Sequence, residues 1–334
     1  MAAPVKEHDI RPKDLFDRYL ELARKDSDAL LAKKAAFERV DCPGCGARDP
    51  EPGLVKDGYA YVLCRACGSL YLDPRPTAAQ MDEFYATAAS VEFWSTDFYA
   101  KTEEARRERL FKPRADLVTR LAGSLGLPKD AALCDVGCGY GIFLEEARAA
   151  GRFKTVAGIE PAAALAATCR KKGFAVVEKT VEKVGPGEVA ADLATCFEVL
   201  EHAHAPVDFL KAARRVLKPG GRLLATTLVC TGFDIAVLWE RSRSVHPPHH
   251  INLLSVDGIR KLFARAGYEI ETLETPGRLD VDIVKNALKD DPALPLPRFV
   301  RSVLASDDAA RAAFQESLAK SLLSSHVRVV ARAA

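Results

Sequence analysis

A glycine-rich loop between a predicted strand and a predicted helix constrains the fold of this chain most strongly. The apolar run Leu133–Val136 carries one acid, Asp135, and three glycines follow it at alternate positions. Glycine has no Cβ, so it permits sharp turns and leaves room for a ligand close to the backbone. The helical pattern Ile142–Ala150 comes next and would offer unpaired N–H groups to anionic or polar atoms. The segment therefore predicts a nucleotide-type cofactor loop.

Strand and helix patterns alternate from about residue 113 to the end of the chain. Such alternation predicts an α/β fold, a doubly wound and mostly parallel sheet with helices on both faces. We expect seven strands and, between them, helices such as 142–150, 162–172, 207–217 and 256–266. The expected strands are Ala132–Val136, Thr155–Ile159, Ala175–Val177, Leu193–Phe197, Arg222–Leu228, Glu269–Leu273 and His326–Ala331.

Three shorter units precede this region. Residues 1–39 predict a helical arm, 40–75 are rich in cysteine and glycine, and 76–112 predict a helical linker or lid before the domain at 113–334. Aromatic residues are concentrated in the linker, where they either form core packing or wall a substrate site. They are Phe84, Tyr85, Phe93, Trp94, Phe98 and Tyr99.

Composition narrows the classes of protein that remain. The net charge is +2 and 28% of the residues are charged, a balance that gives no sign of nucleic-acid binding. The N-terminal residues lack the apolar core of a signal peptide, and no apolar run approaches the roughly 18 residues of a membrane span. Five of the nine cysteines are scattered singly, which is unlike a secreted disulfide framework. We therefore expect a cytoplasmic protein without a membrane span.

Two CxxC pairs indicate a metal site. Cys42 and Cys45 are separated by 18 residues from Cys64 and Cys67, with a strand-like stretch between the pairs. Two such turns joined by a hairpin bring four thiolates together in the tetrahedral geometry that Zn²⁺ prefers. Four protein ligands leave no open position on the metal. The spacing therefore predicts a structural zinc ribbon rather than a catalytic centre.

The cofactor loop has two competing interpretations, a dinucleotide site or an S-adenosylmethionine site. A dinucleotide fingerprint has the spacing GxGxxG, whereas this loop has GxGxG. The carboxylate of Asp135 would repel a pyrophosphate and would attract a cofactor that carries an amino group. Glu160, at the end of the next predicted strand, suits the paired hydroxyls of a ribose in either interpretation.

These residues, with two later motifs, resemble the class I S-adenosylmethionine-dependent methyltransferases. The segments 133–141 and 158–161 resemble the first two motifs of that family, and 191–202 (ADLATCFEVLEH) resembles its fourth-strand motif. Leu217-Lys-Pro-Gly-Gly-Arg222 resembles the turn before its fifth strand. The resemblance implies a seven-stranded Rossmann-like methyltransferase sheet over 113–334 with S-adenosylmethionine as the cofactor.

The family's binding positions carry over one by one. Gly137, Cys138, Gly139 and Gly141 would contact the methionine and ribose parts of the cofactor, with Asp135 near its amino group. Glu160 and Pro161 would lie at the ribose. The resemblance further implies adenine contacts from Thr180 and Val181, and contacts to the methionine end from Phe197 and Glu198.

The methyl acceptor is open between two family groups that combine a zinc knuckle with this domain. One group methylates ribosomal RNA, and the other consists of bacterial enzymes acting on sugars, nucleotide sugars and related small metabolites. Residues 42–85 resemble the second group, and the balanced charge agrees with it. We therefore expect a small acceptor, such as a nucleotide sugar or a glycan precursor, methylated on oxygen or carbon. A non-enzymatic zinc-ribbon module is disfavoured by the intact acids at 135 and 160.

A histidine-rich segment, 244–252 (SVHPPHHIN), supplies candidates for the catalytic base. It follows the fifth predicted strand, and ligands in doubly wound sheets bind beyond the carboxyl ends of the strands. The pKa of histidine suits proton removal from a hydroxyl near neutral pH. We expect the base to be His202, His249 or His250, although each could instead cap a turn or bind a loop carbonyl.

One further polar segment remains ambiguous. In Gly277–Asp282, polar and apolar residues alternate, which predicts an extended segment with one packed face and one free face. Contact with the acceptor and simple polarity at a strand edge are both consistent with this pattern.

Overall fold

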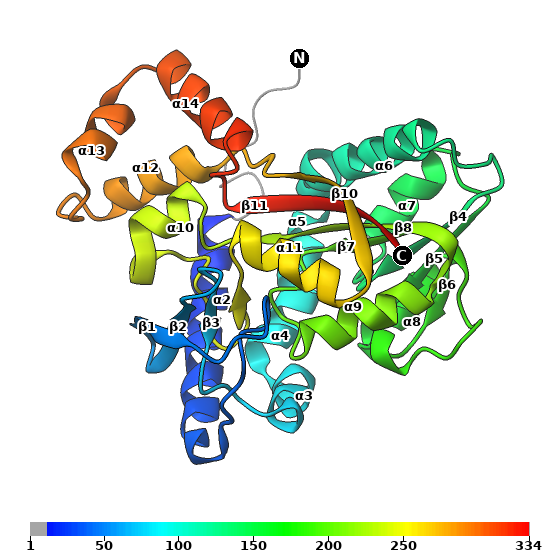
Figure 1. The fold of residues 1–334 in the computed structure, drawn as a ribbon, viewed down its shortest axis with the longest axis horizontal. Coiled ribbons are helices and arrows are strands. Elements are labelled where there is room, and N and C mark those ends of the chain that lie inside the picture. Colours follow the sequence, from blue (N-terminus) through cyan, green and yellow to red (C-terminus); the bar gives the residue numbers. More distant parts are fainter. Residues whose placement is uncertain (1–11, 334) are drawn as a thin grey trace.

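Two β-sheets organise residues 12–333, the part of the chain that the computed structural model describes (Figure 1). The larger sheet has seven strands in the order β10-β11-β8-β7-β4-β5-β6, and the smaller has four in the order β1-β2-β3-β9. The seven-stranded Rossmann-like sheet predicted from the sequence is confirmed. The strands are β1 (Pro50–Lys56), β2 (Tyr59–Cys64), β3 (Leu70–Leu72), β4 (Ala132–Val136), β5 (Thr155–Ile159), β6 (Ala175–Val177), β7 (Ala191–Phe197), β8 (Leu217–Leu228), β9 (Asn252–Leu253), β10 (Tyr268–Glu274) and β11 (His326–Ala333).

Strand β4 lies at the centre of the parallel part of the large sheet. It pairs with β5 on one side and β7 on the other, and β6 and β8 extend the parallel pairing outward. The C-terminal strand β11 is antiparallel and lies between β8 and β10. Because the carboxyl ends of parallel strands share one edge, the loops after β4, β5 and β7 meet there.

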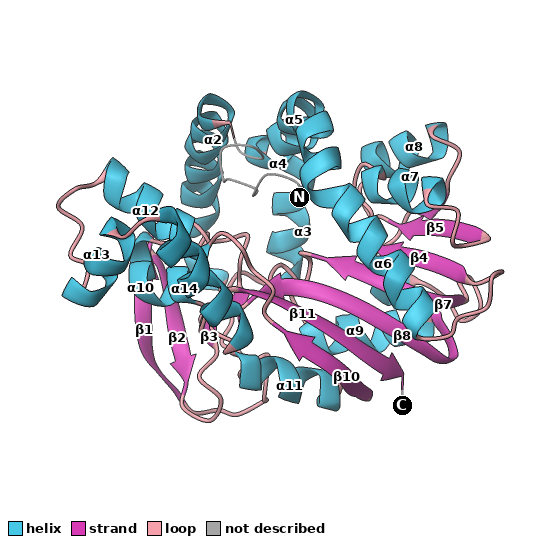
Figure 2. Cartoon of the chain, turned by 90° about the horizontal axis from the view of Figure 1, so that it is seen from above, coloured by secondary structure: helices cyan, strands magenta, loops and turns pink. Residues whose placement is uncertain are grey.

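Helices cover both faces of the large sheet (Figure 2). Helices α6 and α7 contribute to one apolar core, and α9 and α11 contribute to the core on the opposite face. The helices are α2 (Lys13–Leu31), α3 (Ala78–Thr87), α4 (Ala89–Phe93), α5 (Tyr99–Arg106), α6 (Lys112–Ser124), α7 (Ile142–Ala149), α8 (Ala163–Lys171), α9 (Pro206–Arg215), α10 (Phe233–Leu238), α11 (Val256–Arg265), α12 (Asp280–Asp290), α13 (Arg298–Ala305) and α14 (Asp308–Lys320).

The N-terminal units contact the loops beyond the carboxyl ends of the parallel strands, through Tyr85 at His202 and Tyr19 at His246. The predicted arm contains helix α2, while its residues 1–11 lie outside the described part of the chain. The linker contains α3 to α5 together with two π-helical turns, Trp94–Phe98 and Arg107–Phe111. Strand β9 begins at the last residue of the histidine segment and pairs with β3, so the small sheet joins the cysteine-rich unit to the domain that follows it.

Two local expectations differ from the structure. The predicted turn 217–222 belongs to strand β8, whose register against β7 shifts there through a bulge. The extended pattern expected for 277–282 is wrong, because α12 begins at Asp280. The buried Asp280 carboxylate accepts hydrogen bonds from Ser324 Oγ (2.6 Å) and Ser325 N (2.7 Å), contacts with distant residues that no local pattern reveals.

Membrane insertion through a helix finds no support in residues 12–333, where every helix is too short or too polar to span a bilayer.

Candidate cofactor and acceptor site

The glycine loop connects the end of β4 to the start of α7 at the shared edge of the sheet. Gly139 has a φ of +52°, and a Cβ built there would meet no atom within 4 Å. Gly141 has a φ of +73°, and a Cβ there would lie 2.8 Å from Cys169 Sγ. Gly139 therefore leaves open space for a ligand, whereas glycine is required at position 141 by close packing against α8.

Glu160 and Asp135 flank this loop. The carboxylate of Glu160 accepts the N–H of Gly139 at 2.8 Å and the N–H of Ala162 at 2.9 Å. Asp135 accepts a hydrogen bond from Thr195 Oγ1 at 2.7 Å. Burial raises the pKa of Asp135 to about 7 and also raises the pKa of Glu160. Both acids are thus fixed at the loop, where a cationic or hydroxyl-bearing ligand would stabilise their ionised forms.

The remaining residues of the expected cofactor site follow the same strands. Pro161 comes directly after Glu160, and the Cys138 side chain is buried behind the loop. Thr180 and Val181 follow β6, the strand that pairs with β5 beside Glu160. Their placement at one edge of the sheet agrees with the sequence-based assignment, which stays a prediction.

Glu198, directly after β7, is the centre of a charged group that the sequence did not predict. Its Oε1 accepts hydrogen bonds from Thr226 Oγ1 (2.5 Å), His326 Nε2 (2.8 Å) and Arg114 (3.3 Å). Burial alone would raise the pKa of Glu198, but His326 and Arg114 outweigh it and hold that pKa well below its usual range. Glu198 also adopts a positive φ of 57°, an uncommon backbone conformation for a residue with a side chain.

Arg114 stands out in this group because few of its donors are used. Its side chain is 19% exposed, and its guanidinium lies over the ring of Phe197 at 4.8 Å. The bond to Glu198 is the single hydrogen bond that it makes to the described residues. A guanidinium has five N–H donors, so Arg114 can bind a further anionic group at the cofactor site.

Two of the predicted histidines lie together beyond β7. The ring centroids of His202 and His250 are 4.9 Å apart. His202 Nδ1 lies 2.9 Å from the His249 carbonyl oxygen, and His250 Nδ1 lies 2.7 Å from the Ser244 carbonyl oxygen. A carbonyl only accepts, so each Nδ1 carries a hydrogen, and a ring in its neutral form then holds its lone pair on Nε2. Burial lowers the pKa of His202, which favours the neutral ring.

His249 is enclosed by aromatic rings from the arm and the linker. It lies edge-on to Phe84 with ring centroids 5.0 Å apart, and stacks on His246, also at 5.0 Å. Tyr19, from α2, contacts His246 through a 3.1 Å hydrogen bond. His249 Nε2 is buried and has no partner among residues 12–333. An unpaired buried nitrogen costs about 1–3 kcal/mol, which a ligand hydrogen bond would offset.

Glu201 completes the histidine group. Burial raises its pKa to about 8, and its carbonyl oxygen accepts the N–H of Ile251 at 2.9 Å. Glu201, His202 and His250 offer ligand atoms within 4.8 Å of one another, so this group has the spacing to hold a metal ion. Glu201 is distant in the chain from the histidines of 244–252, so local spacing does not reveal that they form one group.

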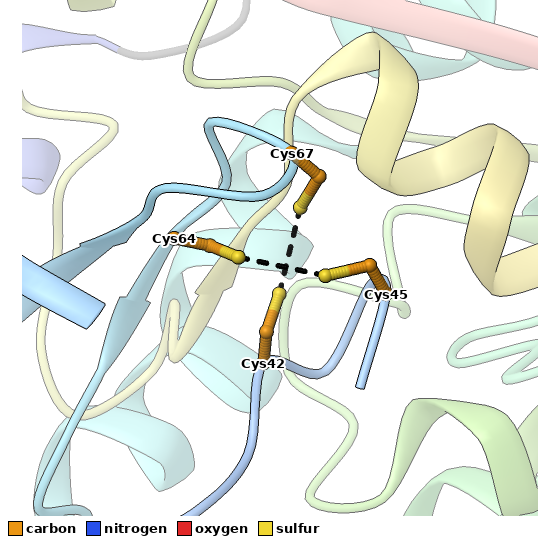
Figure 3. A group of neighbouring side chains, drawn as sticks. All are labelled: Cys42, Cys45, Cys64 and Cys67. Carbon is orange, nitrogen blue, oxygen red and sulfur yellow. Dashed lines mark hydrogen bonds between the residues drawn. The ribbon is translucent and has the colours of Figure 1, made fainter. Parts of the chain in front are cut away.

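The four predicted metal ligands converge at the edge of the small sheet (Figure 3). The Sγ atoms of Cys42 and Cys67 are 3.6 Å apart, and those of Cys45 and Cys64 are 3.5 Å apart. A tetrahedral zinc ion with Zn–S bonds of about 2.3 Å would separate its sulfurs by about 3.8 Å. The cysteine cluster therefore fits the zinc ribbon expected from the sequence.

Comparison with known proteins identifies the family of the domain that carries the glycine loop. Residues 104–273, just over half of the chain, match a family model described as a methyltransferase domain. This chain belongs to the methyltransferase domain family. As a family member it carries the glycine loop, Glu160 and Glu198 inside the matched range, and the cysteine cluster outside it.

Curated relatives of this methyltransferase domain come from ubiquinone biosynthesis. The ubiquinone biosynthesis O-methyltransferase of Pseudomonas paraeruginosa is 37% identical over 136 residues, which cover 36% of this chain and 56% of that protein. The same enzyme of Bordetella avium is 32% identical over 157 residues, covering 45% and 61%. The chain thus spans a little over half the length of the curated relatives it matches.

A solved structure with detectable similarity is an amino pentose methyltransferase from Micromonospora echinaspora with bound S-adenosylmethionine. It is 31% identical, covers 37% of this chain and 54% of its own, and has a TM-score of 0.32. A putative sarcosine dimethylglycine methyltransferase from Galdieria sulphuraria is 16% identical, covers 68% and 88%, and has a TM-score of 0.47.

Proposed function

We propose that this protein transfers a methyl group from S-adenosylmethionine to a hydroxyl, or a carbon, of a sugar-type or other small metabolite, with a histidine as general base. The observation that carries the proposal is the junction of two groups at one edge of the sheet. The glycine loop that Asp135 and Glu160 flank approaches the turn that carries His202, since a Cβ built at Gly137 would lie 2.9 Å from Val199 Cγ2. In this turn and the loop beside it, the Nδ1 atoms of His202 and His250 face backbone carbonyls.

The residues present suit the chemistry of S-adenosylmethionine. Its ribose hydroxyls can donate to Glu160, and its ammonium group can be bound by Asp135 and Glu198. We assign its carboxylate to Arg114, whose guanidinium has unused donors next to both acids. When bound, the cofactor supplies a methyl group that is already activated on a sulfonium.

The chain's remaining task is to orient the acceptor and remove its proton. A sugar hydroxyl is a weak nucleophile at neutral pH, and a base that takes its proton while the new bond forms speeds transfer. We assign this role to Nε2 of His202 or His250, and we assign a hydrogen bond to the acceptor to the unpaired Nε2 of His249. The curated relatives are O-methyltransferases, which favours an oxygen acceptor over carbon.

Substrate screening with matched histidine variants tests this function. Donor consumption would be measured against a panel of nucleotide sugars and simple phenols, with product mass and fragmentation. His202→Ala or His250→Ala is expected to slow turnover by about 10²-fold while leaving cofactor affinity unchanged. His204→Ala is the control, because His204 Nε2 contacts the Pro76 carbonyl oxygen (3.0 Å) and the Glu38 carboxylate (3.2 Å) instead.

The pH dependence gives a second readout of the same assignment. Burial lowers the pKa of His202, so turnover through His202 should fall on acidification with a midpoint below its ordinary value of 6.5. Unchanged turnover in both histidine variants would reject the histidine base. Methylation of ribosomal RNA, with no small acceptor found, would instead support an RNA methyltransferase.

A further inference from the structure

The histidine segment is built into the cysteine-bearing sheet as one of its strands. Strand β9 pairs with β3 through Leu70 opposite Leu253 and Tyr71 opposite Asn252. Just before β9, the N–H of Leu72 donates to the Ile251 carbonyl oxygen at 3.0 Å. The backbone next to His250 is therefore held by the same sheet in which β2 ends at Cys64 and the turn from β2 to β3 carries Cys67.

Tyr61, on β2, contacts the backbone of His250, the proposed base. Its hydroxyl donates to the His250 carbonyl oxygen at 2.8 Å, and its side chain is 1% exposed. Burial raises the pKa of Tyr61 well above its usual value, so the hydroxyl stays a donor at every working pH. Lys56, from β1, donates to the Ser242 carbonyl oxygen at the start of the same excursion.

Both cysteine turns are in contact with the helix that follows the histidine segment. Ser255, the N-cap of α11, donates from its hydroxyl to the Cys67 carbonyl oxygen. Lys261 Nζ donates to the Ala66 carbonyl oxygen (3.1 Å), and Arg265 donates to the Gly44 carbonyl oxygen (2.9 Å). The segment from His250 to α11 thus depends on the cysteine turns at several points along its length.

We propose that the cysteine ribbon, residues 40–75 with their four-cysteine cluster, fixes the position of the proposed base His250. Tyr61 is the residue of the ribbon that positions His250. The ribbon then affects catalysis by holding the loop 244–252 in place, and it does not need to bind a separate ligand. This inference rests on the proposed function, because His250 matters to turnover only if it takes part in methyl transfer.

Two tyrosines on the same strand provide a matched comparison. Tyr59 is also 1% exposed, and its hydroxyl donates to a backbone carbonyl, that of Ser27 in α2, at 2.9 Å. Tyr61→Phe and Tyr59→Phe each remove one buried hydrogen bond of this type. Tyr61→Phe is expected to lower kcat about 5- to 10-fold, with Kd for S-adenosylmethionine within about twofold. Tyr59→Phe should leave kcat within about twofold at a similar loss of stability.

Amide hydrogen exchange provides a readout that does not depend on turnover. Peptides covering 244–255 should exchange faster in Tyr61→Phe and in protein stripped of metal by a chelator, but not in Tyr59→Phe. Cofactor binding, followed by calorimetry, should persist in the stripped protein. Equal effects of the two tyrosine variants on kcat, or unchanged exchange in 244–255 after metal removal, would overturn the proposal.

Failure of the inference is distinguishable from failure of the proposed function. If no acceptor is methylated, exchange in 244–255 still reports whether the ribbon holds the loop, and an unchanged rate overturns the support itself. If methylation proceeds and Tyr61→Phe loosens the loop without lowering kcat, the positioning of His250 is overturned while methyl transfer stands.

Discussion

At the residue scale, Glu160 connects the backbone of the loop to the proposed ligand. Its two carboxylate oxygens each accept one backbone N–H, from Gly139 and Ala162, so the side chain has one orientation. The lone pairs that remain can accept ribose hydroxyls. The sequence predicts this role for Glu160 because an acid at the end of the second strand of such a unit has a local signature.

Replacement of Glu160 tests this double role. Glu160→Gln keeps the size of the side chain but places an amide NH₂ where one backbone N–H now donates, and it removes the charge. We expect the affinity for S-adenosylmethionine to fall about 10- to 100-fold, as for charged hydrogen bonds. Calorimetric titration measures this, with Glu178→Gln, in an exposed ion pair with Arg170, as the control. An affinity within twofold of the unaltered protein would contradict the assignment.

Arg114 and His326 show what single residues do not reveal in a sequence. Both bind Glu198, yet one begins 84 residues before it and the other follows it by 128. An arginine on a helix and a histidine at the start of a strand are common at protein surfaces, so neither residue by itself indicates a site. They share this partner only because β7 ends, and α6 and β11 begin, at the same edge of the sheet.

At the scale of elements, the cysteine ribbon has a clear sequence signature, but its contact with the histidine segment has none. The CxxC spacing predicted four converging thiols, and the structure brings their sulfurs within 4.8 Å of one another. The pairing of β3 with β9 has no such code, because β9 has two residues and no alternating pattern. Short strands of this kind are specified by their partner rather than by their own sequence.

Metal content tests the ribbon directly. The purified protein should contain about one zinc ion per chain, and Cys67→Ser should retain less than about a tenth of it. Loss of a structural metal should also lower Tm by more than about 5 °C. Elemental analysis and thermal unfolding provide these values. Cys196→Ala, which removes a buried thiol outside the cluster, should keep its zinc. Full zinc content in Cys67→Ser would reject the site.

At the scale of the whole molecule, buried carboxyl groups set how stability depends on pH. Burial raises the pKa of Asp135 to about 7, of Asp234 to about 7 and of Glu201 to about 8. Such a group is protonated in the folded protein at a pH where it is ionised in the unfolded chain. Its contribution to stability is therefore full below its ordinary value of 3.8 or 4.5 and is lost as pH rises through 7 and 8.

The unfolding free energy is accordingly expected to decrease between about pH 4.5 and pH 8. Glu198 has the opposite dependence, but its contribution is lost only below its ordinary value of 4.5, outside this window. Urea unfolding at several pH values measures the trend. Glu201→Gln should make the decline shallower, whereas Glu188→Gln, at an exposed site, should not. An identical slope in Glu201→Gln and the unaltered protein would show that Glu201 is ionised in the fold.

The sequence by itself determined the elements whose signals are local. The strand–loop–helix unit at 132–149, the alternation that yields the seven-stranded sheet and the paired CxxC turns each reflect spacing within a few residues. Such periodicities record which side of an element is buried and where the backbone must turn. The family and the cofactor loop therefore followed from the sequence.

Only the tertiary structure decided which distant side chains meet. The Glu198 group with Arg114 and His326, the contact of Tyr61 with His250 and the burial of Asp280 all join residues far apart in the chain. Local sequence patterns do not reveal such contacts, because the contacts form only when elements that are distant in the sequence pack against one another. The glycine loop was thus readable in the sequence, while the surroundings of the proposed base were fixed by the fold.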